Sequence, residues 1–155
     1  MLLNNKNAVI YGAAGHIGSA VARAFARDGA RVFLAGRTLA KLQRVAEEIS
    51  ASGGVAEAAQ VDALDAQSIE QHLDEMVRKV GGIDVSFNAV WIRGDLQGTR
   101  LIDMPVDDFT LPILTGAKTH FLTATAAARH MVRKRSGVIL IAFLGLNLDY
   151  TTGCL

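Results

Sequence analysis

Three glycines near the start of the chain have a spacing that suits phosphate binding. They lie in the segment Gly12-Ala13-Ala14-Gly15-His16-Ile17-Gly18. The first glycine permits a tight turn, the second lets the backbone approach a phosphate, and the third lets a helix pack closely on a strand. The free N–H groups and partial positive charge of a helix N-terminus then favour an anion. The residues predicted to hold the pyrophosphate of a dinucleotide are Gly12, Ala14, Gly15, His16, Ile17 and Gly18.

A structural turn that binds nothing is the alternative interpretation, because a glycine-rich segment alone is a weak signal. The surrounding sequence favours the binding site. An apolar strand precedes the glycines, an amphipathic helix with Ile17, Val21 and Phe25 on one face follows them, and a second strand ends at the expected distance.

The residue after the second predicted strand bears on which dinucleotide is bound. NAD sites usually have an acidic residue there, whereas this chain has Ala35-Gly36-Arg37-Thr38. Arg37 can hold a 2′-phosphate through charge-assisted hydrogen bonds worth about 1.5–3 kcal/mol. At about 1.4 kcal/mol per tenfold, this predicts a roughly 10- to 100-fold preference for NADP(H) over NAD(H). The alternative is a solvated arginine at the start of a helix.

These residues must be positioned by the strands and helices that surround them. Short, continuous apolar runs alternate with helical patterns, as expected for a parallel sheet covered on both faces. This order predicts an α/β fold, a doubly wound parallel sheet of the Rossmann type with right-handed crossovers. The longest predicted helix is Lys118–Lys134. The predicted strands are Ala8–Tyr11, Val32–Ala35, Ala58–Val61, Val85–Asn88 and Val138–Phe143.

Turn signals separate the predicted elements. Glycines at 29, 53–54, 81–82 and 137 each follow a helical stretch, where left-handed caps are common. Thr38 and Asp65 stand where helix N-caps are expected. One long irregular stretch, Val90–Phe109, has the length of a functional loop. Within it, Trp91 either lines a substrate or nicotinamide pocket or packs in the loop.

Length and composition favour one globular domain covering residues 1–155. The net charge of +1 gives no basis for binding nucleic acid or an anionic membrane. No uninterrupted apolar run reaches the roughly 18 residues of a membrane span. The single cysteine, Cys154, cannot form an internal disulfide, and the first residues do not resemble a signal peptide. We therefore expect a cytoplasmic protein.

Other polar residues favour structural roles. His120 and His130 are ten residues apart with no accompanying cluster, so no metal site is predicted. Three aspartates precede or open a helical segment: Asp103, Asp107 and Asp108. Acidic residues are favoured there by the helix dipole, and we prefer this interpretation to a paired-carboxylate site. The basic residues at 129 and 133–135 suit the end of a helix in the same way.

Beyond the glycine turn, the chain resembles the short-chain dehydrogenase/reductase family over essentially its whole length. Val61-Asp62 is similar to the adenine-contacting aspartate of that family, and Asn88-Ala89-Val90 to its Asn-Ala-Gly element. The segments 126–131 and 137–141 are similar to its long helix and fifth strand. The resemblance adds to the cofactor site the residues Asp62, Ala63, Asn88, Ala89 and Val90.

The chain departs from the family pattern slightly in the glycine turn and more strongly at the positions of the catalytic residues. Glycine commonly stands where this chain has His16, with Gly15 one position earlier. The family asparagine falls at or near Gly116 and the family serine near Leu144. The family Tyr-x-x-x-Lys comes further on; Tyr150 is too close and is followed four residues later by cysteine. The resemblance thus implies a sheet incomplete at its C-terminal end, truncated before this motif, with the catalytic residues unknown.

The resemblance implies an NADP(H)-binding oxidoreductase that reduces a carbonyl or oxidises an alcohol by hydride transfer. Two alternatives stay open: a non-catalytic dinucleotide-binding module or truncated pseudoenzyme, and a gene fragment or one lobe completed by another chain. In family members the long helix pairs across a dimer, so the helix 118–134 is a candidate homo-oligomer interface. A fifth strand at the edge of the sheet would favour association.

Overall fold

The protein forms a five-stranded parallel sheet with helices on both faces. The computed structural model describes residues 1–90 and 100–142. The strands stand in the order β3-β2-β1-β4-β5, and every neighbouring pair is parallel, which confirms the predicted doubly wound fold. The strands are β1 (Asn7–Tyr11), β2 (Arg31–Gly36), β3 (Val55–Gln60), β4 (Val85–Asn88) and β5 (Val138–Ile141).

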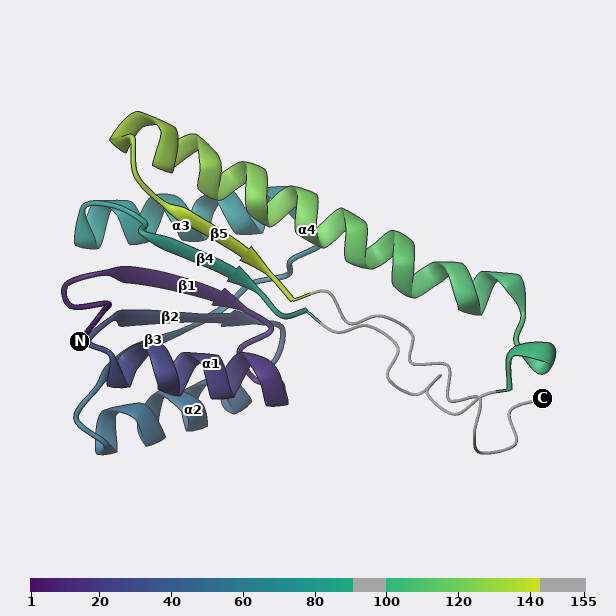
Figure 1. The fold of residues 1–155 in the computed structure, drawn as a ribbon, viewed down its shortest axis with the longest axis horizontal. Coiled ribbons are helices and arrows are strands. Elements are labelled where there is room, and N and C mark those ends of the chain that lie inside the picture. Colours follow the sequence, from purple (N-terminus) through teal and green to yellow (C-terminus); the bar gives the residue numbers. More distant parts are fainter. Residues whose placement is uncertain (91–99, 143–155) are drawn as a thin grey trace.

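The helices divide into two pairs, one on each face of the sheet. Helices α1 (His16–Arg27) and α2 (Leu39–Ala51) cover one face, and α3 (Ala66–Val80) and α4 (Val106–Lys134) cover the other (Figure 1). A short 3₁₀ turn, η2 (Leu101–Asp103), precedes α4. Among the described residues, no helix combines the length and hydropathy needed to cross a membrane.

The core explains why the inner strands are continuously apolar. Ala8 and Ile10 of β1 pack with α1 and α2, whereas Val9 and Tyr11 pack with α3 and α4. Side chains of a strand point alternately to opposite faces, so both faces of β1 must be apolar. All four of these residues are almost fully buried.

Helix α4 begins twelve residues before the start that the sequence predicted. The prediction of an irregular segment up to residue 109 was therefore wrong at its end, since residues 106–109 are helical. The first part of α4 escaped prediction because its apolar residues are exposed and Pro112 lies within the helix. Asp107 and Asp108 occupy the first turn, as expected for acids at a helix start. Trp91 lies outside the described residues.

Most of the predicted helix ends agree with the structure. Asp65 caps α3, its Oδ1 accepting a hydrogen bond of 2.9 Å from Gln67 N–H, whereas Thr38 takes the N-cap position of α2 without a side-chain bond. At the end of α4 the left-handed residue is Arg135, not Gly137, with a φ of 55°. Strand β3 begins three residues earlier than predicted and ends at Gln60.

Candidate functional site

The order of the strands reverses direction between β1 and β4, whose carboxyl ends lie at the same edge of the sheet. The chain builds outward from β1 through β2 to β3 and then returns to the other side of β1 with β4. Ligands of open α/β sheets bind where the strand order reverses in this way. In register with Tyr11, the last residue of β1, are Ala35 of β2 and Asn88 of β4. The predicted site residues follow directly after these positions.

Two of the three glycines are required by the packing of the protein itself. Gly12 has a φ of +72°, and a Cβ there would lie 2.6 Å from the carbonyl oxygen of Ala89. A Cβ on Gly18 would lie 2.3 Å from the carbonyl oxygen of Gly12. The turn therefore lies directly on the segment after β4, and α1 lies directly on the turn.

Gly15 differs from the other two glycines. It is the N-cap of α1 with an ordinary φ of −80°, and the nearest atom to a Cβ there is the carbonyl oxygen of Gly12 at 3.3 Å. Ala14, Gly15, His16 and Ile17 are all exposed. A Cβ at Gly15 would make a tight contact but not the severe overlap found at Gly12 and Gly18, so the fold requires glycine less strictly here.

The glycine turn leaves several backbone donors free. Gly12 N–H and Ala13 N–H donate to the carbonyl oxygen of Ala35 at 3.0 and 3.3 Å, which ties the turn to β2. Within the part of the chain that the structure describes, the N–H groups of Ala14, His16 and Ile17 have no acceptor. Exposed N–H groups at a helix N-terminus form an anion site, because the helix dipole adds to their attraction.

Arg37 comes two residues after Ala35, the residue of β2 whose carbonyl oxygen accepts hydrogen bonds from the glycine turn. It is exposed, and no ion pair joins it to another described residue. The carbonyl oxygen of Gly36 accepts a hydrogen bond of 2.9 Å from Val61 N–H, so the ends of β2 and β3 stay side by side. Arg37 thus follows β2 at the carboxyl edge of the sheet, where the glycine turn follows β1.

Asp62 and Ala63 follow β3 at this edge. The exposed Asp62 accepts a hydrogen bond from Leu64 N–H at 2.9 Å, and its own N–H donates to Ser68 Oγ of α3 at 3.3 Å. Ala63 is buried in the core beneath α3 and α4. The loop is therefore held by α3, with one carboxylate oxygen of Asp62 left for a ligand.

Asn88 fixes the segment after β4. Its side chain is 1% exposed; Nδ2 donates to Thr123 Oγ1 at 2.9 Å, and Oδ1 accepts from Val90 N–H at 2.9 Å. Ala89, half-buried, is the residue that Gly12 contacts. Asn88 thus holds the segment after β4 in place from within the protein. Thr123 was not predicted from the sequence, although Thr119 and Thr123 lie four residues apart on the buried face of α4 and this spacing could have indicated it.

The described residues hold no exposed proton donor of the predicted kind. Tyr11 is 1% exposed, its hydroxyl has no hydrogen-bond partner among the described residues, and burial raises its pKa above the ordinary value. At Gly116, where the family asparagine was expected, a Cβ would meet nothing within 4 Å. Leu144, Tyr150 and Cys154 lie outside the described residues.

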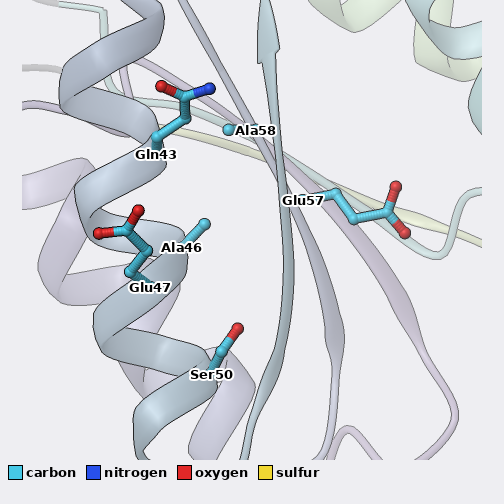
Figure 2. A pocket seen from close by; sticks show the side chains of 6 residues that line it. All are labelled: Gln43, Ala46, Glu47, Ser50, Glu57 and Ala58. Atoms are coloured by element: carbon cyan, nitrogen blue, oxygen red, sulfur yellow. The ribbon is translucent and has the colours of Figure 1, made fainter.

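Other features of the surface offer no competing site. A shallow groove between α2 and β3 lies beside the middle of the edge strand, away from the carboxyl ends, and the carboxylate of Glu57 projects to the side of β3 opposite α2 (Figure 2). Among residues 1–90 and 100–142, no group of three potential ligands could hold a metal ion. Burial lowers the pKa of His120, and His130 Nε2 lies 3.5 Å from Asp74 Oδ1. The groove is lined by Gln43, Ala46, Glu47, Ser50, Glu57 and Ala58.

Comparison with known proteins adds independent evidence. A family model described as "short chain dehydrogenase" matches residues 6–142. An L-rhamnose 1-dehydrogenase (NAD(P)(+)) from Azotobacter vinelandii is 36% identical over 153 residues, covering 95% of this chain and 58% of the relative. The crystal structure of a metagenomic short-chain oxidoreductase in complex with NADP is 31% identical, with a TM-score of 0.77 over 94% of this chain and 65% of that one.

A further solved structure binds the other nicotinamide dinucleotide. NAD⁺-bound xylitol dehydrogenase is 26% identical, with a TM-score of 0.81 over 91% of this chain and 54% of that one. Among the curated relatives that it matches, the chain spans 50% of an oxidoreductase from Bacillus subtilis and 58% of one from Staphylococcus aureus. It therefore corresponds to about half the length of these relatives.

Proposed function

This chain belongs to the short-chain dehydrogenase family, and on that premise we propose that it binds NADP(H) in preference to NAD(H). The observation that carries the proposal is the row of exposed, free backbone N–H groups at Ala14, His16 and Ile17. They surround Gly15, which the fold requires less strictly than Gly12 or Gly18, at the point where the strand order reverses. A pyrophosphate satisfies these donors and the helix dipole together.

The preference for NADP(H) rests on Arg37. Its guanidinium has no carboxylate partner among the described residues, and Arg37 follows the strand tied to the glycine turn. A 2′-phosphate there would gain charge-assisted hydrogen bonds that a 2′-hydroxyl cannot match. The adenine would lie toward Asp62 and Ala63, and the nicotinamide toward Asn88, Ala89 and Val90.

Hydride transfer needs a proton donor in addition to the cofactor. The nicotinamide supplies or accepts the hydride, while a side chain exchanges a proton with the carbonyl or alcohol oxygen of the substrate. The 155 residues contain no Tyr-x-x-x-Lys, and Tyr11 is buried. We therefore assign cofactor binding to this chain. We assign carbonyl reduction or alcohol oxidation to the protein only where further residues or another chain supply the donor.

Calorimetric titration with NADPH and NADH tests the binding proposal. We expect NADPH to bind about 10- to 100-fold more tightly than NADH, and Arg37→Ala to remove most of that difference. Arg44→Ala is a matched control, because Arg44 is also exposed and has no ion pair among the described residues. Equal affinity for the two cofactors, unchanged by Arg37→Ala, would contradict the preference.

A turnover assay separates an enzyme from a binding module. The chain is incubated with NADPH and a panel of aldehydes and ketones, and absorbance at the nicotinamide band is followed. Without a general acid, we expect rates about 10²- to 10⁴-fold below those of a complete relative. Robust turnover by these 155 residues would show that another group donates the proton and would overturn the assignment.

The outer face of α4 is the candidate subunit interface. Leu114, Phe121 and Val132 lie on it at intervals of seven and eleven residues and are 67%, 68% and 74% exposed. We propose that two copies of the chain pair through this face. Sedimentation velocity is expected to show a dimer that Phe121→Asp dissociates, whereas Leu2→Asp, at another exposed apolar position, leaves it intact. A monomer at all concentrations would contradict the interface.

A further inference from the structure

Strand β3 is an outer strand of the sheet and has no neighbour beyond it among residues 1–90 and 100–142. Outer strands present unpaired N–H and C=O groups, and proteins usually protect them with lysine, proline, a bulge or a very short strand. β3 is six residues long, pairs with β2 in an uninterrupted register and has the sequence Val-Ala-Glu-Ala-Ala-Gln. It therefore carries none of these protective features.

Alternate residues of β3 direct their backbone groups to the free edge. Val61 N–H, just after the strand, donates to the carbonyl oxygen of Gly36 at 2.9 Å, so the backbone of Val61 faces β2. Successive residues of a strand direct these groups to opposite sides, so those of Ala56 and Ala58 face away from β2. Both side chains are single methyl groups that pack against the core under α1 and α2. Neither methyl group is large enough to screen the outward N–H and C=O groups.

The groove between α2 and β3 adjoins this edge. Gln43, Ala46 and Ser50 point from α2 toward the strand, and Ala58 lies across the groove from them (Figure 2). Because Ala46 and Ala58 are both small, space is left between the helix and the strand. The side chains on one face of a strand added beside β3 would enter this space.

The groove carries a carboxylate that no cation neutralises. Glu47 is exposed and forms no ion pair with another described residue, including Arg44 one turn earlier on α2. The carboxylate of Glu57 lies on the other side of β3, where it pairs with Lys79 (Figure 2). The described residues that line the groove include no lysine or arginine. A partner with a cationic side chain would complement this charge.

We propose that β3 binds an extended, cationic segment of another protein by strand addition. The backbone groups of Ala56 and Ala58 hydrogen-bond the backbone of the segment, and a lysine or arginine on its α2 side lies against Glu47. In this mode of recognition the main-chain bonds give affinity and the alternate side chains give specificity. A second copy of the chain fits less well, because the groove of each copy would offer the other no cation.

The test measures binding of fluorescein-labelled peptides to the 155-residue chain by fluorescence anisotropy. The probes are short peptides that alternate threonine and valine, with either lysine or glutamate at one central position. We expect the lysine peptide to bind more tightly, and Glu47→Gln to lower its affinity roughly 1.5- to 5-fold, as for an exposed ion pair. Asp74→Asn removes an exposed carboxylate near His130 of α4 instead and should leave the affinity unchanged. Circular dichroism confirms that both variants are folded.

N-methylated peptides separate strand addition from attraction by charge alone. Methyl groups on one alternate set of amides block the hydrogen bonds to β3, whereas methyl groups on the other set point away from it. One set should therefore lower the affinity of the lysine peptide about tenfold or more, as expected for the loss of two backbone hydrogen bonds. The other set should leave the affinity within about twofold of the unmethylated peptide.

Each result bears on a different part of the proposal. Equal losses for the two methylated sets, or no loss for either, would overturn strand addition, because binding would not use the edge of β3. Equal affinity of the lysine and glutamate peptides would overturn the assignment of a cationic segment. Absence of binding by every peptide would overturn the proposal as a whole, and a dimer of the Phe121→Asp variant in sedimentation velocity would then point to a second copy at this edge.

Discussion

The inner strands β1 and β2 and the strand β5 at the edge of the described sheet are covered differently, although all three consist largely of apolar residues. On one side, β1 and β2 stand between two neighbours each, and Ile10, Val32 and Leu34 are fully buried. On the other side, β5 has β4 as its neighbour in the described part of the chain, and all of its residues, Val138–Ile141, are between 37% and 51% exposed. The outer face of α4 is similarly open.

This difference bears on two parts of the family's function, the proposed binding of the dinucleotide and the catalytic step. The residues proposed to hold the pyrophosphate and the 2′-phosphate follow β1 and β2, each of which has a neighbouring strand on both sides, so the glycine turn is held by the buried core. The family serine falls near Leu144, after β5 in the sequence and outside the described residues. The proposed phosphate-binding turn therefore follows a buried strand, whereas the strand that precedes the family serine in the sequence is partly exposed.

Substitution of matched leucines tests this comparison with the largest expected effect. Leu34 is 0% exposed in β2 and Leu140 is 42% exposed in β5. Leu34→Ala should lower the free energy of unfolding by about 2–5 kcal/mol, because it leaves a cavity in the core. Leu140→Ala should cost less than about 1 kcal/mol, since much of its surface already contacts water.

Urea denaturation followed by circular dichroism measures both variants under the same conditions. Similar losses for the two leucines would show that β5 is covered in solution. The comparison between a closed and an open side of the sheet would then fail.

The glycine turn allows a second comparison, between two glycines three residues apart. Gly18→Ala should destabilise the fold by about 1–3 kcal/mol, because the new Cβ would lie 2.3 Å from backbone. Gly15→Ala should change stability by less than about 1 kcal/mol but lower the affinity for NADPH by about tenfold or more. Denaturation and calorimetric titration of both variants check this. A Gly15→Ala variant that binds NADPH normally would contradict the role given to Gly15.

How much of the fold the sequence predicts depends on how completely each element is covered. Strands β1 and β2 show continuous apolar runs, because both of their faces are buried, and the sequence placed them within one residue at each end. Strand β4, Val85-Ser86-Phe87-Asn88, is also buried throughout although two of its residues are polar. The first part of α4 shows no such pattern. Ile113 and Leu114 are exposed there, and Pro112 interrupts the helical pattern, so periodicity could not reveal the helix.

The candidate site also has features that the sequence predicts and features that it does not. The glycine spacing and Arg37 were predicted because backbone freedom and charge are properties of the residues themselves. The contact between Gly12 and Ala89 and the bond between Asn88 and Thr123 join segments 77 and 35 residues apart, so no local pattern encodes them. These contacts follow only from the order of the strands.

The bond between Asn88 and Thr123 connects the closed and open sides and gives a smaller effect. Asn88→Ala leaves the buried Thr123 hydroxyl and Val90 N–H with fewer partners, so we expect a loss of about 1–3 kcal/mol in stability. Thr123→Val tests the same bond from α4. In a double-mutant cycle the two losses should be non-additive by about 0.5 kcal/mol or more. Additive losses would show that the bond does not couple the two sides.

The smallest effect concerns His72, a histidine on the buried face of α3. His72 is 9% exposed and its Nε2 has no partner among the described residues; burial lowers its pKa from the model-peptide value of 6.5, although Glu75 and Glu57 partly oppose this. The folded protein therefore binds a proton at His72 less readily than the unfolded chain, which takes up a proton below about pH 6.5. Stability should be retained above that pH and decline as the pH falls below it.

His72→Leu removes the titrating group and fills much of the same space. Its free energy of unfolding should decline less between pH 7.5 and 5.5 than that of the wild type, measured by urea denaturation at each pH. His130→Gln is the control, because it removes a histidine of α4 whose Nε2 lies 3.5 Å from Asp74 Oδ1. If His72→Leu and the wild type lose stability in parallel, the imidazole of His72 is protonated in the folded state, and α3 is less closely packed on the sheet than the structure indicates.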